Sequence, residues 1–245
     1  MTLIRRQYQI RYRQSFVGVV WAIIPPLASL GAGTLVFDQI FGVDTGKTSY
    51  ALFTLSALVP WSFLSSGLSS AVTSVAAGQS LVTRSVFPRA VLPIGAIGTA
   101  FIDFAIAGVL FVVLLFAIGD GLRLTAAWFP ALLLIEVVLV TGLALLGSAL
   151  HVFARDVKLA VPLVIQFWLF LTPVMYPMSE IPVGLRPWYL ANPMTGVVES
   201  FRRILLFGQT PDLEMLLPAI VGAVVVLAVG SWYFRATESR FADVI

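Results

Sequence analysis

Residues 91–118 read VLPIGAIGTAFIDFAIAGVLFVVLLFAI and contain one charged side chain, Asp103. A helix needs about 20 apolar residues to cross the hydrocarbon core of a bilayer, where only a helix satisfies its own backbone polar groups. This stretch exceeds that length, so it predicts a membrane-spanning helix.

Five other segments match or approach the same pattern. The six expected spans are residues 17–41, 50–77, 91–118, 127–153, 159–176 and 215–234. Charged residues make up 11% of the chain, against about a quarter in soluble domains, and the apolar set reaches 59%. The sequence therefore predicts an all-α polytopic membrane protein. Residues 17–234 form one six-span domain, with residues 1–16 before it and a tail at 235–245.

The lysine and arginine residues are unequally divided between the two sides of these spans. One side has Arg5, Arg6, Arg11, Arg13, Arg84, Arg89, Arg155, Lys158, Arg235 and Arg240. The other side has Lys47, Arg123, Arg186, Arg202 and Arg203. Cytoplasmic loops carry the excess of basic residues. Both termini are therefore expected in the cytoplasm.

The first sixteen residues have a helical pattern. Ile4, Tyr8, Tyr12 and Phe16 recur every four residues, with the basic side chains elsewhere. This pattern indicates an amphipathic helix at the membrane interface. The alternative is a simple basic flank that anchors the first span.

The connection at residues 177–214 is the longest and is expected on the outer side. Asn192 followed by Pro193 is a typical helix start. Beyond it, an apolar face repeats with helical spacing, and Gly208 ends the run. Glu199, Arg202 and Arg203 lie off that face. The pattern predicts a short amphipathic helix at the outer surface or dipping back into it.

Several kinds of site are disfavoured by the sequence. Gly42–Thr48 contains Gly-Lys-Thr, but Phe41 stands where a phosphate loop needs its first glycine, and a membrane span precedes it. Cysteine is absent and His151 is the one histidine, which leaves little for a metal site or a membrane-embedded enzyme. The net charge of +3 gives nucleic-acid binding little support. We expect no catalytic residue, cofactor or metal in this chain.

Acidic and aromatic side chains within the spans are the remaining candidates. Asp103 and Glu136 suit a proton relay, because ionisable groups at membrane depth usually mark a function. Alternatively, each acid hydrogen-bonds to a neighbouring helix. The aromatic residues of the fifth span suit either packing or stacking on sugar rings.

Several motifs occur together in one family, in the same order and over nearly the whole chain. They are residues 11–15 (RYRQS) with Gly18, Trp21 and Pro25, residues 86–89 (VFPR), Arg155-Asp156, residues 171–177 (LTPVMYP) and Asn192-Pro193. In this the chain resembles the permease subunit of polysaccharide and polyol-phosphate ABC exporters of the O-antigen, capsule or teichoic-acid type. The resemblance implies a homodimer in the bacterial cytoplasmic membrane that works with two copies of a separate ATP-binding subunit. That partner would bind ATP and magnesium, and the cargo would be a lipid-linked polymer moved outwards.

The resemblance also implies two functional regions. Residues expected to dock on the ATPase are Arg5, Arg6, Arg11, Arg84, Ser85, Val86, Phe87, Pro88 and Arg89. Residues expected to line the channel or form its gate are Trp168, Phe170, Pro173, Tyr176, Pro177, Asn192 and Pro193. The outer segment at 177–208 would close a channel lined by the first and fifth spans. The competing hypothesis is a proton-coupled secondary transporter that uses Asp103 and Glu136 and needs no partner.

Overall fold

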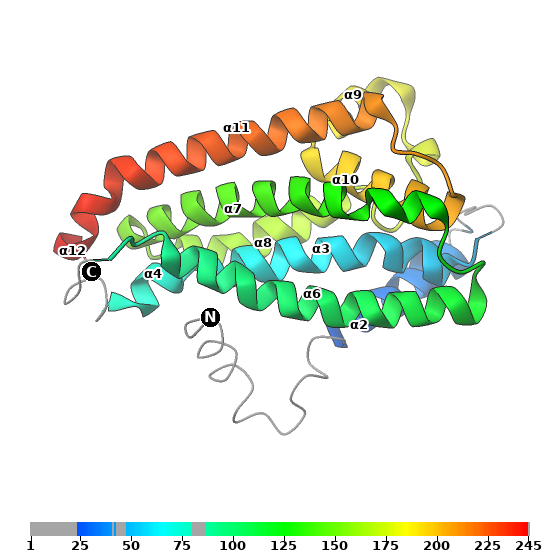
Figure 1. The fold of residues 1–245 in the computed structure, drawn as a ribbon, viewed down its shortest axis with the longest axis horizontal. Coiled ribbons are helices and arrows are strands. Elements are labelled where there is room, and N and C mark those ends of the chain that lie inside the picture. Colours follow the sequence, from blue (N-terminus) through cyan, green and yellow to red (C-terminus); the bar gives the residue numbers. More distant parts are fainter. Residues whose placement is uncertain (1–23, 41, 43–47, 80–86, 245) are drawn as a thin grey trace.

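The computed structural model describes residues 24–40, 42, 48–79 and 87–244, and every regular element in these residues is a helix. Figure 1 shows the long helices side by side along the long axis of the molecule. Helices α9 and α10 lie at one end, here called the α10 end. Helices α4 and α12 lie at the opposite end, here called the α4 end. The chain is an all-α polytopic membrane protein.

Each of the six expected spans contains a helix. The first two are α2 (Ile24–Gly33), continued by a π-helical segment at Thr34–Ile40, and α3 (Tyr50–Val72), followed by α4 (Ser74–Ala77). The others are α6 (Val91–Ile118), α7 (Phe129–Phe153), α8 (Val157–Phe170) and α11 (Leu213–Thr237). Among the described residues, α3, α6, α7 and α11 belong to the four helices that are long and apolar enough to cross a membrane, whereas α2 and α8 are shorter.

Short elements connect the long helices. The turn η3 (Leu124–Trp128) leads into α7. Between α8 and α11 the chain forms η4 (Met178–Glu180), η5 (Val183–Leu185), α9 (Arg186–Ala191), α10 (Pro193–Arg202) and the π-helical η6 (Arg203–Phe207). The tail forms η7 (Glu238–Arg240) and α12 (Phe241–Val244).

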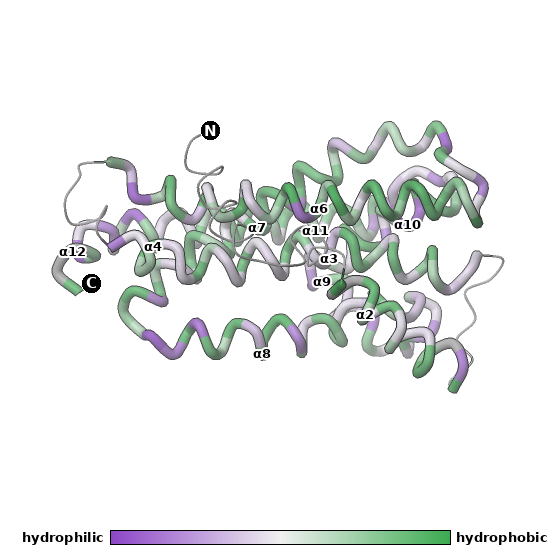
Figure 2. The backbone as a smooth tube through the Cα atoms, turned by 90° about the horizontal axis from the view of Figure 1, so that it is seen from below, coloured by the Kyte–Doolittle hydropathy of each residue, from purple (hydrophilic) through white to green (hydrophobic). Residues whose placement is uncertain are grey.

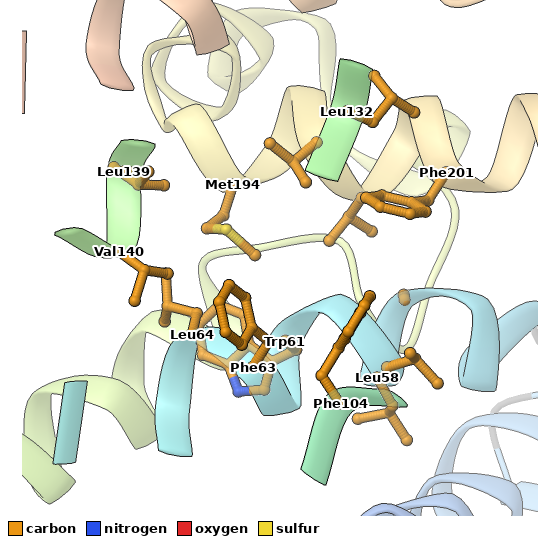
Figure 3. Close-up of a cluster of buried hydrophobic side chains, with 14 of the residues drawn as sticks. Leu58, Trp61, Phe63, Leu64, Phe104, Leu132, Leu139, Val140, Met194 and Phe201 are labelled. Carbon is orange, nitrogen blue, oxygen red and sulfur yellow. The ribbon is translucent and has the colours of Figure 1, made fainter. Parts of the chain in front are cut away.

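Helix α3 is the centre of the bundle, because it packs against α6, α7 and α10. Its side chains Leu58, Trp61 and Phe63 meet Phe104 of α6 and Phe201 of α10 in one buried cluster (Figure 3). Helices attract one another weakly through hydrophobicity inside a bilayer, so close van der Waals packing has to hold them together.

Glycines make that close packing possible between α7, α10 and α11. A methyl group added at Gly230 of α11 would lie 2.1 Å from the carbonyl oxygen of Gly142 in α7. One added at Gly196 of α10 would lie 2.2 Å from the carbonyl oxygen of Met215 in α11. Larger side chains at these positions would force the helices apart, as expected for small-residue contacts between membrane helices.

Helix α8 lies along one edge of the bundle (Figure 2). Of its residues, Ile165 alone is buried, whereas Leu159, Leu163 and Phe167 are 58–71% exposed. A surface this apolar needs lipid or another protein against it.

The structure departs from the expectations at two places. The fifth span ends at Phe170 instead of continuing to Tyr176, since residues 171–177 lie outside any helix. Arg202, expected in a connection on the aqueous side, is completely buried. The expected amphipathic helix at residues 1–16 and the start of the first span lie outside the described residues.

A second, smaller apolar cluster lies at the α4 end. It contains Phe234 of α11 and Phe241 of α12, whose rings meet edge to face with centroids 5.3 Å apart. Phe87, one of the expected ATPase-docking residues, packs against this cluster. The tail is therefore part of the folded domain at this end.

Candidate functional site

The helix α10 begins as the sequence predicts. The side-chain oxygen of Asn192 accepts a hydrogen bond from the backbone N–H of Met194 at 3.1 Å, and Pro193 occupies the first helical position. Gly208 follows the helix with a positive φ of 64°, a backbone conformation that glycine adopts without steric cost. The helical segment therefore has a defined start at Asn192 and a defined end at Gly208.

Helix α10 is not a surface helix. Met194, Val197, Val198 and Phe201 are at most 1% exposed, and the helix packs against α3, α7 and α11. Figure 3 shows Met194 and Phe201 turned toward the side chains of α3, α6 and α7. The sequence left two positions open for this helix, at the outer surface or dipping back into it. In the structure the helix is inserted into the bundle.

Arg202 holds the end of α10 against the loop that follows α8. We call residues 171–177 the strap. The guanidinium of Arg202 donates hydrogen bonds to two consecutive strap carbonyl oxygens, that of Pro173 at 2.6 Å and that of Val174. It also contacts the carboxylate of Glu199 at 2.6 Å. Arginine suits this task because its planar fork of donors addresses several acceptors at once.

A planar face of the same guanidinium lies over an aromatic ring. The central carbon of the guanidinium is 3.7 Å from the ring centroid of Phe53 in α3, and Nε donates to the Phe53 carbonyl oxygen at 3.4 Å. Cation–π contacts are strongest where water is excluded, as here. Arg202 thus connects α3, α10 and the strap.

Asn192 joins the start of α10 to the strap and to the end of α8. Its side-chain oxygen accepts from Nε1 of Trp168 at 2.9 Å, while its amide nitrogen donates to Leu171 O at 3.1 Å and to Thr172 Oγ1 at 2.9 Å. The Trp168 ring meets Trp61 of α3 edge to face at 5.9 Å. One side chain therefore caps α10 and joins it to the end of α8.

Tyrosine hydroxyls hold the remaining part of the strap. Tyr50 donates to the Met175 carbonyl oxygen at 3.0 Å, and Tyr176 donates to the Phe170 carbonyl oxygen. The hydroxyls of Tyr176 and Tyr189 lie 3.0 Å apart. The strap is thus bonded to α3, α8, α9 and α10. The strap, α10 and these anchoring side chains are called the strap assembly below.

The strap assembly gathers most of the expected channel and gate residues. Trp168, Phe170, Pro173, Tyr176, Asn192 and Pro193 all belong to it. Pro177 lies at its edge and begins the next short helix, η4. Sequence reasoning missed Arg202, Phe53 and Tyr50. A signal was available for Arg202, because it stands between Phe201 and the Arg203-Ile204-Leu205 segment with Glu199 three residues before it, which is the spacing of an ion pair on a helix.

The expected ATPase-docking residues are only partly described. Arg5, Arg6, Arg11, Arg84, Ser85 and Val86 lie outside the described residues. Phe87, Pro88 and Arg89 precede α6 at the α4 end, and the carbonyl oxygens of Pro88 and Arg89 accept from the first N–H groups of that helix at 3.1 Å. Phe87 packs against the second apolar cluster, and the docking role of the three residues stays a prediction.

The structure does not join the two acids of the proton-relay hypothesis. Asp103 is 8% exposed and accepts from Ser66 Oγ at 3.5 Å. Glu136 is fully buried, and neither of its carboxyl oxygens has a hydrogen-bond partner among the described residues. A relay needs donors and acceptors in sequence, and within the part of the chain that the structure describes no hydrogen bond leaves the Glu136 carboxyl group.

The strap assembly occurs in a chain whose family can be identified over most of its length. The model of the ABC-2 type transporter family matches residues 1–206. The chain belongs to this family. It is similar to the O-antigen export system permease protein RfbA of Myxococcus xanthus, with 28% identity over 247 residues that cover all of this chain and 94% of the relative. The RfbA protein of Klebsiella pneumoniae is 24% identical over 246 residues, with the same coverage.

A third relative of this ABC-2 chain is the polysialic acid transport protein KpsM of Escherichia coli. It is 26% identical over 250 residues, which cover 96% of this chain and 92% of the relative. Two of these relatives are named as permeases of O-antigen export systems and the third as a polysialic acid transport protein. The resemblance found in the ordered motifs is therefore confirmed, and so is the assignment of the chain as a multi-pass membrane protein.

Proposed function

We propose that this chain is the permease subunit of an ATP-driven exporter that moves a lipid-linked polysaccharide outwards across the bacterial cytoplasmic membrane. The observation that carries the proposal is the strap assembly, which fastens an inserted helix across one end of the bundle in a relative of polysaccharide export permeases. Two copies of this chain would work with two copies of a separate ATP-binding subunit, which would hold the ATP and magnesium.

The distribution of charge supports an orientation with both termini in the cytoplasm. Arg89, Arg155, Lys158, Arg235 and Arg240 occur in or beside the connections at the α4 end. At the α10 end, Arg202 is buried and so does not count among the basic residues in water. Leaving Arg202 out of the count increases the excess of basic residues at the α4 end, and this excess favours a cytoplasmic α4 end under the positive-inside rule.

The exposed apolar faces of α2 and α8 support a second copy and a channel. Leu27 and Leu35 in the first span are 43% and 58% exposed, and Phe167 in α8 is 71% exposed. Two copies placed with these faces toward each other would enclose a passage lined by the first and fifth spans. Phe167 and Phe170 would then present rings to passing sugars.

The strap assembly has the properties needed for a gate at the outer end of that passage. Directional hydrogen bonds hold the strap on the neighbouring helices, so the strap has one defined position, which would be the closed state of the gate. Moving the strap away from α10 would break the two Arg202 bonds to consecutive carbonyls together, because both acceptors lie on the same short segment. Such a cluster opens as a unit.

Co-purification with a partner and assay of ATP hydrolysis form the first test. The tagged permease is extracted from its native membrane, and the proteins recovered with it are identified. We expect an ATP-binding subunit in equal ratio and hydrolysis that both proteins together support. A permease recovered alone from several detergents, with no hydrolysis, would contradict the proposal.

Variants of the expected docking loop test the coupling. Phe87→Ala and Arg89→Ala should uncouple ATP hydrolysis from polymer export while the complex still assembles. The matched control is Leu124→Ala, since Leu124 is 98% exposed and lies in η3 at the opposite end. Normal export in both loop variants would remove the docking role.

The proton-coupled alternative is tested by Asp103→Asn and Glu136→Gln. It requires transport without a partner and the loss of transport in the Asp103 variant. If this chain is an ATP-driven permease, Asp103→Asn retains ATP-dependent export. The isolated burial of Glu136 gives a relay no support.

A further inference from the structure

A cavity of about 620 Å³ opens between α6, the start of α7 and the back of α10. Along α6 its lining extends from Phe101 to Val113. Twelve residues of helix rise by about 18 Å. The cavity is therefore a groove that runs along α6. Phe201 and Leu205 of the α10 and η6 segment line it, together with residues 56, 59 and 60 of α3.

The lining of the groove is hydrocarbon. Of the described residues that line it, Ser56 alone has a polar side chain, and its hydroxyl already donates to the Phe53 carbonyl oxygen at 2.7 Å. A buried water needs two to four polar partners. Water therefore cannot fill the groove, and an empty groove of this size would leave its lining without van der Waals contacts.

The groove is open toward the membrane. Val109 and Val113 on its α6 wall are 65% and 58% exposed, and Leu122 at its rim is 50% exposed. Because these residues belong to or adjoin a membrane-spanning helix, the medium outside the groove is the interior of the bilayer. A hydrocarbon chain is the occupant that this surface selects.

The length of the groove and the charged side chains at its rim indicate which hydrocarbon chain binds there. One half of the hydrocarbon core is about 15 Å thick, close to the extent of the groove from its rim near the α6–α7 connection. Arg123 follows Leu122 at this rim and has a side chain 40% exposed, although it pairs with Asp120. The Asp120 carboxylate binds Nη2 of this guanidinium, and a guanidinium has further N–H donors that can bind the phosphate of a lipid from the nearer leaflet.

We propose that this groove is a binding site for one acyl chain of a glycerophospholipid from the leaflet at the α10 end. The chain rests on Phe201, and the next residue is Arg202, which holds the strap. The bound lipid contacts α10 at Phe201, next to the residue that holds the strap. This consequence rests on the proposed gate function, whereas the site itself does not.

Photo-crosslinking tests the site directly. The permease with its partner subunit is reconstituted into vesicles of phosphatidylethanolamine and phosphatidylglycerol that contain a phospholipid with a diazirine on one acyl chain. After illumination, mass spectrometry maps the adducts. We expect them to concentrate at residues 101–113 and 126–133. Adducts spread evenly over the exposed faces of α6, α7 and α11 would overturn the proposal.

Filling the groove provides the decisive variant. A methyl group built at Gly108 has no neighbour within 4 Å, so Gly108→Phe can project into open space without a clash. It should lower the adducts at residues 101–113 and 126–133 at least tenfold. The matched control is Gly31→Phe in α2, where a methyl group also meets nothing within 4 Å, and it should leave those adducts unchanged. Undiminished labelling in Gly108→Phe contradicts the site.

Two further measurements separate the possible outcomes. Thermal unfolding checks that Gly108→Phe is folded, and Gly108→Leu replaces it if it is not. An excess of polyprenyl phosphate is then added during labelling. We expect no competition, whereas a tenfold loss of adducts would assign the groove to an isoprenoid lipid carrier and overturn the phospholipid proposal. Labelling requires neither ATP nor export, so a failure of the proposed transport function would leave this result intact.

Discussion

Two ion pairs of equal length lie in different regions at the α10 end. Arg202 and Glu199 in the strap assembly are 2.6 Å apart, as are Arg123 and Asp120 in the connection between α6 and α7, and both pairs have partners three residues apart. Their exposures differ: the side chains are 0% and 12% exposed in the first pair, and 40% and 80% in the second. A short distance alone therefore says little about what a pair contributes.

The two ion pairs are expected to contribute differently to stability because they differ in exposure to water. Water screens the exposed pair and competes for its charges, so such pairs contribute about 0–1 kcal/mol. The buried arginine has given up its hydration and depends on the protein for every partner it has. Removing it leaves a buried carboxylate and two carbonyl groups behind, which is costly.

The largest effect is expected from Arg202→Met. The loss of the guanidinium should lower the free energy of unfolding by about 3–5 kcal/mol, because Glu199 and two strap carbonyls lose their partner. Denaturant titration of the purified permease in detergent measures this change. The double variant Arg202→Met with Glu199→Gln should recover part of the loss, since it removes the orphaned charge. A loss no larger than that of an exposed arginine would break the comparison.

Asn192→Ala should have the next largest effect. It removes a helix cap, worth about 1 kcal/mol, together with the bond accepted from Trp168 and two donated bonds, worth about a further 1–2 kcal/mol in all. Asn192→Asp separates these contributions, because it keeps the two accepted bonds and loses both donated ones. The same titration measures both variants, and a full loss in Asn192→Asp would mean that the accepted bonds, the cap among them, contribute nothing.

Arg203→Met tests a pair of intermediate exposure. Arg203 lies 3.3 Å from Asp212, and the two side chains are 30% and 32% exposed. We expect a loss of about 0.5–1 kcal/mol that shrinks in 1 M salt, where the screening length falls to about 3 Å. The effect of Arg202→Met should not change with salt. Equal salt dependence in the two variants would contradict the role given to burial.

Asp120→Asn should have the smallest effect. The carboxylate is mostly in water, so the expected change in the free energy of unfolding is within about 0.5 kcal/mol. Unfolding midpoints of the variant and the unmodified protein should coincide in high salt. A loss above 1 kcal/mol would show that distance matters more than solvation here.

The spans and the cap of α10 could be predicted from sequence because their signals are local. The helix α6 occupies the expected residues 91–118, and α7 ends at Phe153 as expected. Asn192 and Pro193 specify a helix start by their own backbone and side-chain chemistry. For such elements the partners are only a few residues away.

The strap and the burial of Arg202 could not be predicted in the same way. Hydrophobic spacing shows which residues share a face but not what lies opposite a polar one. The acceptors of Arg202 are 28 and 29 residues earlier in the chain, and Phe53 is 149 residues earlier. Pro173 is a local signal that a helix ends near here, since proline has no N–H to donate, but nothing near it in the sequence shows that Asn192, Tyr50 and Arg202 bind this backbone.

The backbone contacts of α11 give this helix the mechanics of a lever. The contact between Gly230 and Gly142 acts as a fulcrum, since a glycine junction has no side chain that can yield by changing rotamer. Phe234, in the second apolar cluster, lies four residues to one side. Ala219, whose methyl group would lie 2.8 Å from one built on Gly196 of α10, lies eleven residues to the other. For a rigid helix, the ratio of these arms is about two- to threefold. A small tilt at the aromatic cluster thus swings the opposite arm further, and in the reverse direction.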